Sequence, residues 1–172
     1  MSEYQIRAFL EHNALEIKNL AEQSDILQVV MMSGAPPNKY ILRFHAPGLV
    51  RDPATGEIAT APFCDVGIWF PDDYLTRCMP FEVVTWLHPA HAWNPHVMAP
   101  FVCLGHLNEG TRLIDIAYQA YEVWTCQNVN WKDPLNRQAA DWGRCTPERF
   151  PIDSRPLKRR HIPVQLEEKE AS

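Results

Sequence analysis

One cysteine and four histidines stand close together in the middle of this chain. Residues 86–106 read WLHPAHAWNPHVMAPFVCLGH, so that Cys103 follows a stretch rich in proline and histidine. A thiolate is a strong nucleophile, and imidazoles exchange protons near neutral pH. The stretch therefore indicates covalent chemistry on the sulfur of Cys103, on an exposed loop between a strand and a helix.

Periodicity predicts the elements that precede this stretch. Residues 2–23 carry apolar side chains at helical spacing, which predicts an amphipathic first helix. Residues 27–32, 40–46, 63–70 and 81–87 form alternating or β-branched runs, which predict four strands. A turn over 34–38, a surface loop over 51–57 and a proline-bound crossover over 71–80 connect them. We therefore expect an antiparallel meander.

Two helices are expected after Cys103. The apolar residues between Leu113 and Trp124 fall on one face, and the polar run 108–111 is expected to cap that helix. A second short helix is expected from about Pro134, because proline suits the first turn of a helix. Residues 1–148 are predicted to form one catalytic domain of the α+β class, and the proline- and charge-rich residues 149–172 a tail.

Composition limits the partners and the compartment. The 172 residues carry a formal net charge of −5, which offers no basic surface to nucleic acid. No apolar stretch of about eighteen residues occurs, so no membrane partner is expected and the protein is placed in the cytoplasm. The five cysteines are widely spaced without a Cys-x-x-Cys pair, so neither disulfides, a metal nor another cofactor is expected.

The element order and four local motifs resemble the ubiquitin-conjugating enzymes, which carry a ubiquitin-like protein as a thioester on a cysteine. The motifs are the crossover at 74–80, His88-Pro89 at the family's His-Pro-Asn turn, Val102-Cys103-Leu104 at its apolar-Cys-Leu signature, and Asp133-Pro134-Leu135-Asn136 before its late helix. The resemblance covers residues 1–145. It implies the UBC-like fold and three partners, namely a ubiquitin-like activating enzyme, a ubiquitin-like modifier protein and a target protein.

The chain also departs from the family pattern. The family's asparagine, two residues after its histidine, is Ala90 here, and the loop from His88 to Cys103 is longer than usual. The second crossover proline is replaced by Leu75. These departures resemble divergent bacterial members, which are encoded beside activating enzymes and ubiquitin-like proteins in antiviral defence systems.

The resemblance implies that Cys103 acts first as nucleophile and then as leaving thiolate. Aminolysis of a thioester passes through a tetrahedral oxyanion, and one hydrogen bond to that oxyanion contributes about 3 kcal/mol. Because the family's asparagine is missing, Asn94, His96 and His91 are the candidate donors.

Other residues of the stretch receive different roles. His106, three residues after Cys103, and His96 are candidate general bases for the incoming amine. His88 and Pro89 are expected to shape the loop rather than take part in the chemistry.

Three alternatives are weighed against the transferase. A catalytically silent module of the same fold would bind a ubiquitin-like protein without forming a thioester. A metal site would use His88, His91, His96, Cys103 and His106. A thiol hydrolase would pair Cys103 with His96 or His106 and release its product to water.

Overall fold

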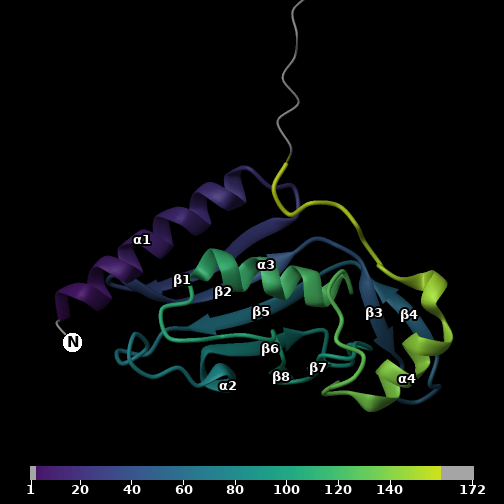
Figure 1. Cartoon of the computed structure of the whole chain (residues 1–172). Coiled ribbons are helices and arrows are strands. Elements are labelled where there is room, and N and C mark those ends of the chain that lie inside the picture. Colours follow the sequence, from purple (N-terminus) through teal and green to yellow (C-terminus); the bar gives the residue numbers. More distant parts are fainter. Residues whose placement is uncertain (1–2, 160–172) are drawn as a thin grey trace, which may run out of the picture.

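The computed structural model describes residues 3–159 of the chain. In chain order, its elements are α1 (Glu3–Glu22), β1 (Leu27–Gly34), β2 (Pro37–Phe44), β3 (Gly48–Arg51), β4 (Ile58–Ala61), β5 (Cys64–Trp69), α2 (Pro80–Val83), β6 (Val84–His88), β7 (Val97–Met98), β8 (Phe101–Val102), α3 (Leu113–Trp124), α4 (Arg137–Cys145) and the 3-10 turn η1 (Pro147–Arg149). The class is mixed α+β, as predicted, with one helix before the main sheet and two after it (Figure 1).

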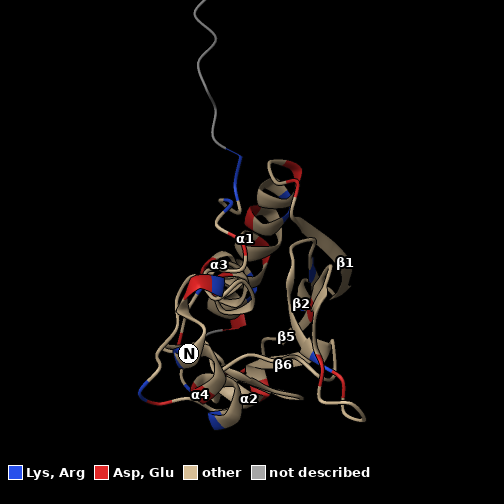
Figure 2. Cartoon of the chain, turned by 90° about the vertical axis from the view of Figure 1, so that its right-hand side faces the viewer, with Lys and Arg blue, Asp and Glu red and all other residues tan. Residues whose placement is uncertain are grey.

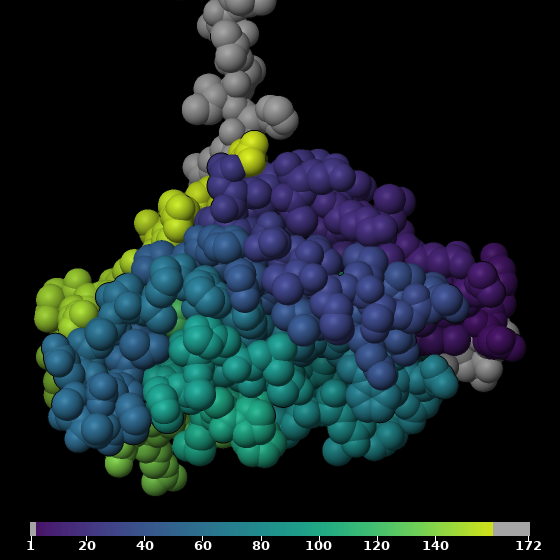
Figure 3. All heavy atoms as spheres, turned by 180° about the vertical axis from the view of Figure 1, so that it is seen from behind, coloured from purple at the N-terminus to yellow at the C-terminus, as the bar shows by residue number. Residues whose placement is uncertain are grey.

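The main sheet has four strands in the order β1-β2-β5-β6, and all neighbours are antiparallel. This arrangement confirms the predicted meander. Along β2, Tyr40, Leu42 and Phe44 are buried and alternate with more exposed residues, because successive side chains point to opposite faces of a sheet. The helices α1 and α3 lie on the buried side (Figure 2). Seen from the other side, the surface is formed mainly by the first two thirds of the chain, coloured purple to teal (Figure 3).

The ring of Trp124, at the end of α3, fills the centre of the core. It is fully buried and packs against Trp86 of β6, with the ring centroids 5.5 Å apart. Its indole Nε1 donates to the carbonyl oxygen of Ala46 at 2.8 Å. The start of β3 passes directly over this ring at Gly48, where there is no room for a side chain. Trp124 thereby fixes α3 against the main sheet and the start of β3.

Three boundaries differ from the expectations. The loop expected over 51–57 is the tip of an additional hairpin, β3–β4. The strand expected from residue 81 begins at Val84, because Pro80–Val83 forms one helical turn. The late helix begins at Arg137 rather than at Pro134, because the Asn136 side chain accepts a hydrogen bond from the Ala139 backbone N–H at 3.1 Å and caps the helix.

The cap of α3 comes from another helix. The residue before α3, Arg112, makes no capping bond through its side chain. Instead, the buried Asn13 of α1 accepts a hydrogen bond from the Leu113 backbone N–H at 2.5 Å and donates to the Phe9 carbonyl at 2.7 Å. The expectation that residues 108–111 cap this helix was therefore wrong. A buried side chain 100 positions away satisfies the first N–H of the helix.

The segment after η1 returns along the domain. Its backbone carbonyl at Arg155 accepts from the Tyr121 hydroxyl at 2.7 Å, and its Leu157 is buried, with its carbonyl bonded to the Ser24 hydroxyl. The expected tail starts at residue 149, but the packed part of the chain reaches Arg159, whose N–H donates to Gln23. The tail prediction for 160–172 lies outside the described residues.

The close approach at Gly48 yields a stability prediction. A Cβ built there would lie 2.3 Å from Trp124 Cε2, inside a buried ring that is held by its own hydrogen bond. We expect Gly48→Ala to lower the free energy of unfolding by about 1–3 kcal/mol, as overpacked cores do. Urea denaturation of both proteins measures this difference.

Gly67→Ala is the matched control. A Cβ at this strand position would meet the exposed, flexible Leu87 side chain at 3.3 Å. We expect a change below about 0.5 kcal/mol. Equal losses in the two variants would contradict the role assigned to Trp124.

Candidate active site

Cys103 stands at the end of a small hairpin that places His96 opposite it. In this hairpin Val97 pairs with Val102, and Met98 pairs with Phe101. One step further along the same register, the Cys103 N–H donates to the His96 carbonyl at 2.8 Å. Directly opposed residues of antiparallel strands project to the same face, with Cβ atoms about 5 Å apart. His96 and Cys103 are therefore neighbours, although six residues separate them in the sequence.

Two pockets of different character meet at Cys103, which is half-buried. A polar pocket of about 260 Å³ is lined by His96, Cys103, Leu104, Gly105, His106, Val123, Asn128, Asn130 and Asp133. A smaller pocket of about 130 Å³ is lined by Pro80, Phe81, Val84, Val102, Cys103, Leu104, Gly105 and Leu107. The thiol therefore has polar groups on one side and apolar side chains on the other.

Asn94 anchors the loop before the hairpin. Its side chain is buried, and its Nδ2 donates to the Val123 carbonyl at 2.7 Å and to Cys126 Sγ at 3.3 Å. Its Oδ1 accepts from the His96 N–H at 2.8 Å. The residue does not line either pocket at Cys103. The structure thus uses the amide of Asn94 to hold the hairpin against the end of α3.

His96 is buried beneath the loop that follows α3. Its Nε2 accepts a hydrogen bond from the Asn130 backbone N–H at 2.9 Å, while its Nδ1 is buried and has no partner among the described residues. Burial lowers the pKa of His96 below its ordinary value, and the negative charge of Asp133 opposes this shift. The ring is therefore held in its neutral form, with the proton on Nδ1, because Nε2 acts as an acceptor.

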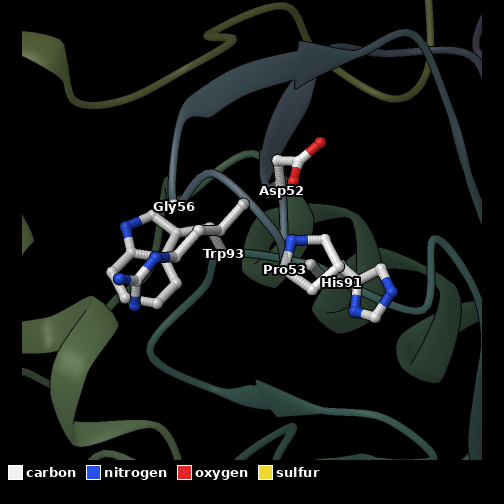
Figure 4. A pocket seen from close by; sticks show the side chains of 7 residues that line it. Asp52, Pro53, Gly56, His91 and Trp93 are labelled. Carbon is white, nitrogen blue, oxygen red and sulfur yellow. The ribbon is translucent and has the colours of Figure 1, made fainter.

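His91 lies at a different site. It lines a pocket of about 360 Å³ beside the β3–β4 hairpin, together with Arg51, Asp52, Pro53, Gly56, Ala92 and Trp93. In Figure 4 the His91 ring and the Trp93 ring lie on opposite sides of Pro53. The His91 carbonyl accepts from the Arg51 N–H at 3.0 Å, which ties this loop to β3. The structure does not bring His91 into either pocket that contains Cys103.

Of the remaining predicted residues, His88 and Pro89 lie outside the pockets at Cys103, and His106 lines one of them. The exposed His88 ring stacks on Phe63 with centroids 4.9 Å apart, and the Pro89 carbonyl accepts from Trp86 Nε1 at 2.9 Å. Neither residue lines a pocket with Cys103. His106 is exposed and does line the polar pocket. It follows Gly105, whose φ of 85° turns the chain sharply after the cysteine.

The five residues of the metal-site alternative do not converge. Only His96, Cys103 and His106 share a pocket. Within residues 3–159, no group of three or more His, Cys, Asp or Glu side chains is placed to hold a metal ion. The arrangement therefore offers a thiol, an imidazole donor and polar groups, rather than a coordination sphere.

Three residues of the polar pocket were missed by the sequence analysis. Asn128, Asn130 and Asp133 come from the loop between α3 and α4. Asp133 belongs to the Asp-Pro-Leu-Asn motif, which was interpreted only as the opening of a helix. A carboxylate just before a helix cap, in a motif that already stood out, was the available signal. The sequence around Asn128 and Asn130 carries no such signal, because the position of these two side chains depends on the conformation of the loop.

Comparison with protein-family models and with curated proteins finds no match to this chain. In the described part of the chain, no helix combines the length and the apolar character needed to cross a membrane.

The buried imidazole makes stability depend on pH. Because burial lowers the pKa of His96 in the folded state, the unfolded chain binds the proton first as pH falls. Protonation also removes the acceptor of the Asn130 N–H. We expect the contribution of the neutral His96 ring to the free energy of unfolding to be complete above about pH 6.5. This contribution should be lost as pH falls through the lowered pKa of His96. Urea denaturation at a series of pH values measures it.

Two variants isolate this contribution. His96→Gln keeps an acceptor but does not titrate, so it should flatten the pH dependence in this range. His106→Gln, which removes an exposed imidazole from the same pocket, should retain the wild-type dependence. An unchanged slope in His96→Gln would contradict the assignment.

Proposed function

We propose that this chain is a ubiquitin-like protein conjugating enzyme of the UBC-like fold. It accepts a modifier from an activating enzyme as a thioester on Cys103 and transfers the modifier to an amine of a target protein. The observation that carries this proposal is the position of Cys103 between an apolar and a polar pocket. An acyl carrier needs both, because it must hold the acyl chain and also admit a polar acceptor.

The apolar pocket suits the acyl side of such a thioester. Its lining includes the exposed Phe81, which packs edge-on against Phe101 of the hairpin with centroids 5.4 Å apart. An extended peptide end entering here would cover these rings and place its carbonyl carbon at the sulfur. The element order from α1 to α4 and the motifs around Cys103 are similar to those of the conjugating enzymes and support the same assignment.

The chemistry runs in two exchanges. In the first, the Cys103 thiolate attacks the thioester carbonyl on the activating enzyme, a new C–S bond forms, and the activating enzyme's thiolate leaves. In the second, a neutral amine attacks the Cys103 thioester, an amide C–N bond forms, and Cys103 leaves as a thiolate. The amine proton passes to solvent. Neither exchange needs an oxidant or a metal.

The polar pocket suits the incoming amine. Asp133 lies on the wall of this pocket and is exposed. An exposed carboxylate attracts an approaching ammonium group and positions it near the sulfur, at a modest gain in free energy. The asparagines at 128 and 130 line the same wall. We therefore assign the loop between α3 and α4 to acceptor binding.

The arrangement favours a carrier over a thiol hydrolase. A hydrolase of this kind uses an imidazole hydrogen-bonded to its cysteine as the base. Here His96 Nε2 is occupied by the Asn130 N–H, and no hydrogen bond joins Cys103 Sγ to an imidazole among residues 3–159. A thioester on Cys103 therefore has no imidazole hydrogen-bonded at its sulfur to activate water, so it persists until an amine arrives.

A charging assay tests the proposal. Wild type, Cys103→Ala and Cys103→Ser are incubated with ATP, the ubiquitin-like modifier and an activating enzyme from the same genome, and run on nonreducing gels. We expect a thiol-sensitive adduct with wild type, none with Cys103→Ala, and a thiol-resistant oxyester with Cys103→Ser.

Cys145→Ala is the matched control. Cys145 is an exposed free cysteine at the end of α4 and lines neither pocket at Cys103. It should charge like wild type. If the activating enzyme is itself charged and wild type forms no adduct, the carrier function is wrong and the silent binding module takes its place.

Asp133→Asn tests the acceptor side. Loss of the carboxylate should leave charging intact and slow transfer to free lysine by about two- to fivefold at low salt, with a smaller effect at high salt because exposed charges are screened. Single-turnover discharge of the purified thioester measures this rate. Asp141→Asn, an exposed carboxylate on α4, should transfer like wild type; equal slowing of both variants would contradict a specific role.

A further inference from the structure

The apolar pocket at Cys103 has no charged or polar side chain in its wall. Apart from Cys103 itself, the wall consists of Pro80, Phe81, Val84, Val102, Leu104, Gly105 and Leu107. The second pocket at the same cysteine contains two histidines, two asparagines and an aspartate. An acyl group bonded to Cys103 therefore starts at the junction of two environments, and only the first of them favours apolar atoms.

The inner part of this pocket belongs to the hydrophobic core. Val84 at the start of β6, Val102 of β8 and Leu107 are all buried. The hydrogen bond from the Trp86 N–H to the Pro100 carbonyl joins β6 to the segment that leads into β8, so the two valines are held on connected strands. Core side chains keep their positions because their neighbours pack closely around them. The pocket therefore has its shape before a substrate arrives.

Exposed apolar side chains stand at the edge of the pocket. Phe81, which lines it, packs edge-on against Phe101, with the ring centroids 5.4 Å apart. Met98 lies directly opposite Phe101 in the hairpin, so the two side chains project from the same face. All three are exposed. Apolar side chains that gather on a surface beside a pocket mark a binding surface.

The size of the pocket limits what can enter it. Its volume is about 130 Å³, well below the range of about 300–1,000 Å³ that is typical of small-molecule sites. One aliphatic side chain suits this volume. The bond to Cys103 decides where that side chain comes from, because each residue of an extended peptide spans only about 3.3–3.6 Å. Only the last two residues of a chain bonded at Cys103 are close to the pocket wall.

We propose that the apolar pocket selects modifiers that carry an aliphatic side chain on one of their last two residues. The inference rests on the proposed function, because it names the class of substrate that Cys103 carries. The side chain is buried against Val84, Val102 and Leu107, and the preceding residues cover Phe81 and its neighbours. A glycine would leave the pocket empty. A polar side chain would lose its hydrogen bonds to water, and no side chain of the wall replaces them.

Thiol–thioester exchange tests this selectivity without an activating enzyme. The probes are acetylated pentapeptides whose C-terminal carbonyl is bonded to 2-mercaptoethanesulfonate. The Cys103 thiolate attacks this carbonyl carbon, the C–S bond to Cys103 forms, the bond to mercaptoethanesulfonate breaks, and that group leaves as a thiolate. Mass spectrometry of the intact protein follows the acylation rate. The same measurement on Cys103→Ala gives the acylation of the other cysteines, which is subtracted.

The peptides differ only in their last two residues, which are Gly-Gly, Gly-Val, Gly-Thr, Val-Gly or Thr-Gly. Valine and threonine have the same shape and hinder the thioester equally, so their ratio reports the effect of the hydroxyl alone. The rate of each peptide with glutathione corrects for its intrinsic reactivity. At one of the two positions we expect valine to react about 10- to 100-fold faster than threonine. The valine peptide should also react faster than Gly-Gly after the same correction.

Variants of one wall residue connect the preference to this pocket. Phe81→Ala removes an apolar wall and should reduce the valine-to-threonine ratio several-fold, whereas Phe81→Leu should retain most of it. Met79→Ala is the matched control, because Met79 is 48% exposed, against 55% for Phe81, but does not line the pocket. It should keep the wild-type ratio. Each ratio compares two peptides on the same protein, so a loss of folded protein cancels.

The outcomes separate this inference from the proposed function. A corrected ratio near one at both positions overturns the selectivity, as does an equal loss of the ratio in Phe81→Ala and Met79→Ala. Failure of Cys103 to react with any of the peptides also overturns it. A protein that shows the preference but takes no modifier from a charged activating enzyme supports the selectivity of the pocket and overturns the carrier function.

Discussion

The buried amide of Asn94 is the interaction on which the geometry around Cys103 depends. Its donor group bonds to the Val123 carbonyl and to Cys126 at the end of α3, and its acceptor oxygen fixes the backbone of His96. Removal of this side chain would leave the buried His96 backbone N–H without its acceptor, at a cost of about 1–3 kcal/mol. One residue therefore joins the hairpin that carries the cysteine to the helix behind it.

The loop before Cys103 contains a hairpin that brings residues distant in the sequence together. The residues from Val97 to Val102 fold back as a hairpin, so that a residue before the hairpin meets a residue after it. The Trp86 N–H bonds to the Pro100 carbonyl at 2.8 Å and attaches the hairpin to the main sheet. These backbone hydrogen bonds hold the hairpin in place, so the side chains on its face keep a fixed separation.

The sequence predicts the elements with a strong period and misses those that depend on distant partners. The apolar spacing in α1 and α3 and the alternation in the four main strands were sufficient to predict the meander and its helices. The four-residue strands β3 and β4 are too short to show a period. The cap by Asn13 could not be predicted, because its partner is Leu113. In the candidate site, Cys103 and both histidines of the polar pocket were among the predicted residues. The sequence alone did not distinguish Asn94, which is buried and anchors the loop, from a reactive group, because burial depends on tertiary packing.

The path of the C-terminal segment has a consequence for how a newly made chain reaches this structure. The hydroxyls of Ser24 and Tyr121, which come from the first and the third quarter of the sequence, donate hydrogen bonds to the carbonyls of Leu157 and Arg155. A nascent chain that has left the ribosome as far as α4 still lacks these acceptors and the side chain of Leu157, which fills part of the core. Completion of this part of the core therefore waits for the segment around Leu157, which follows every helix and strand of the described fold.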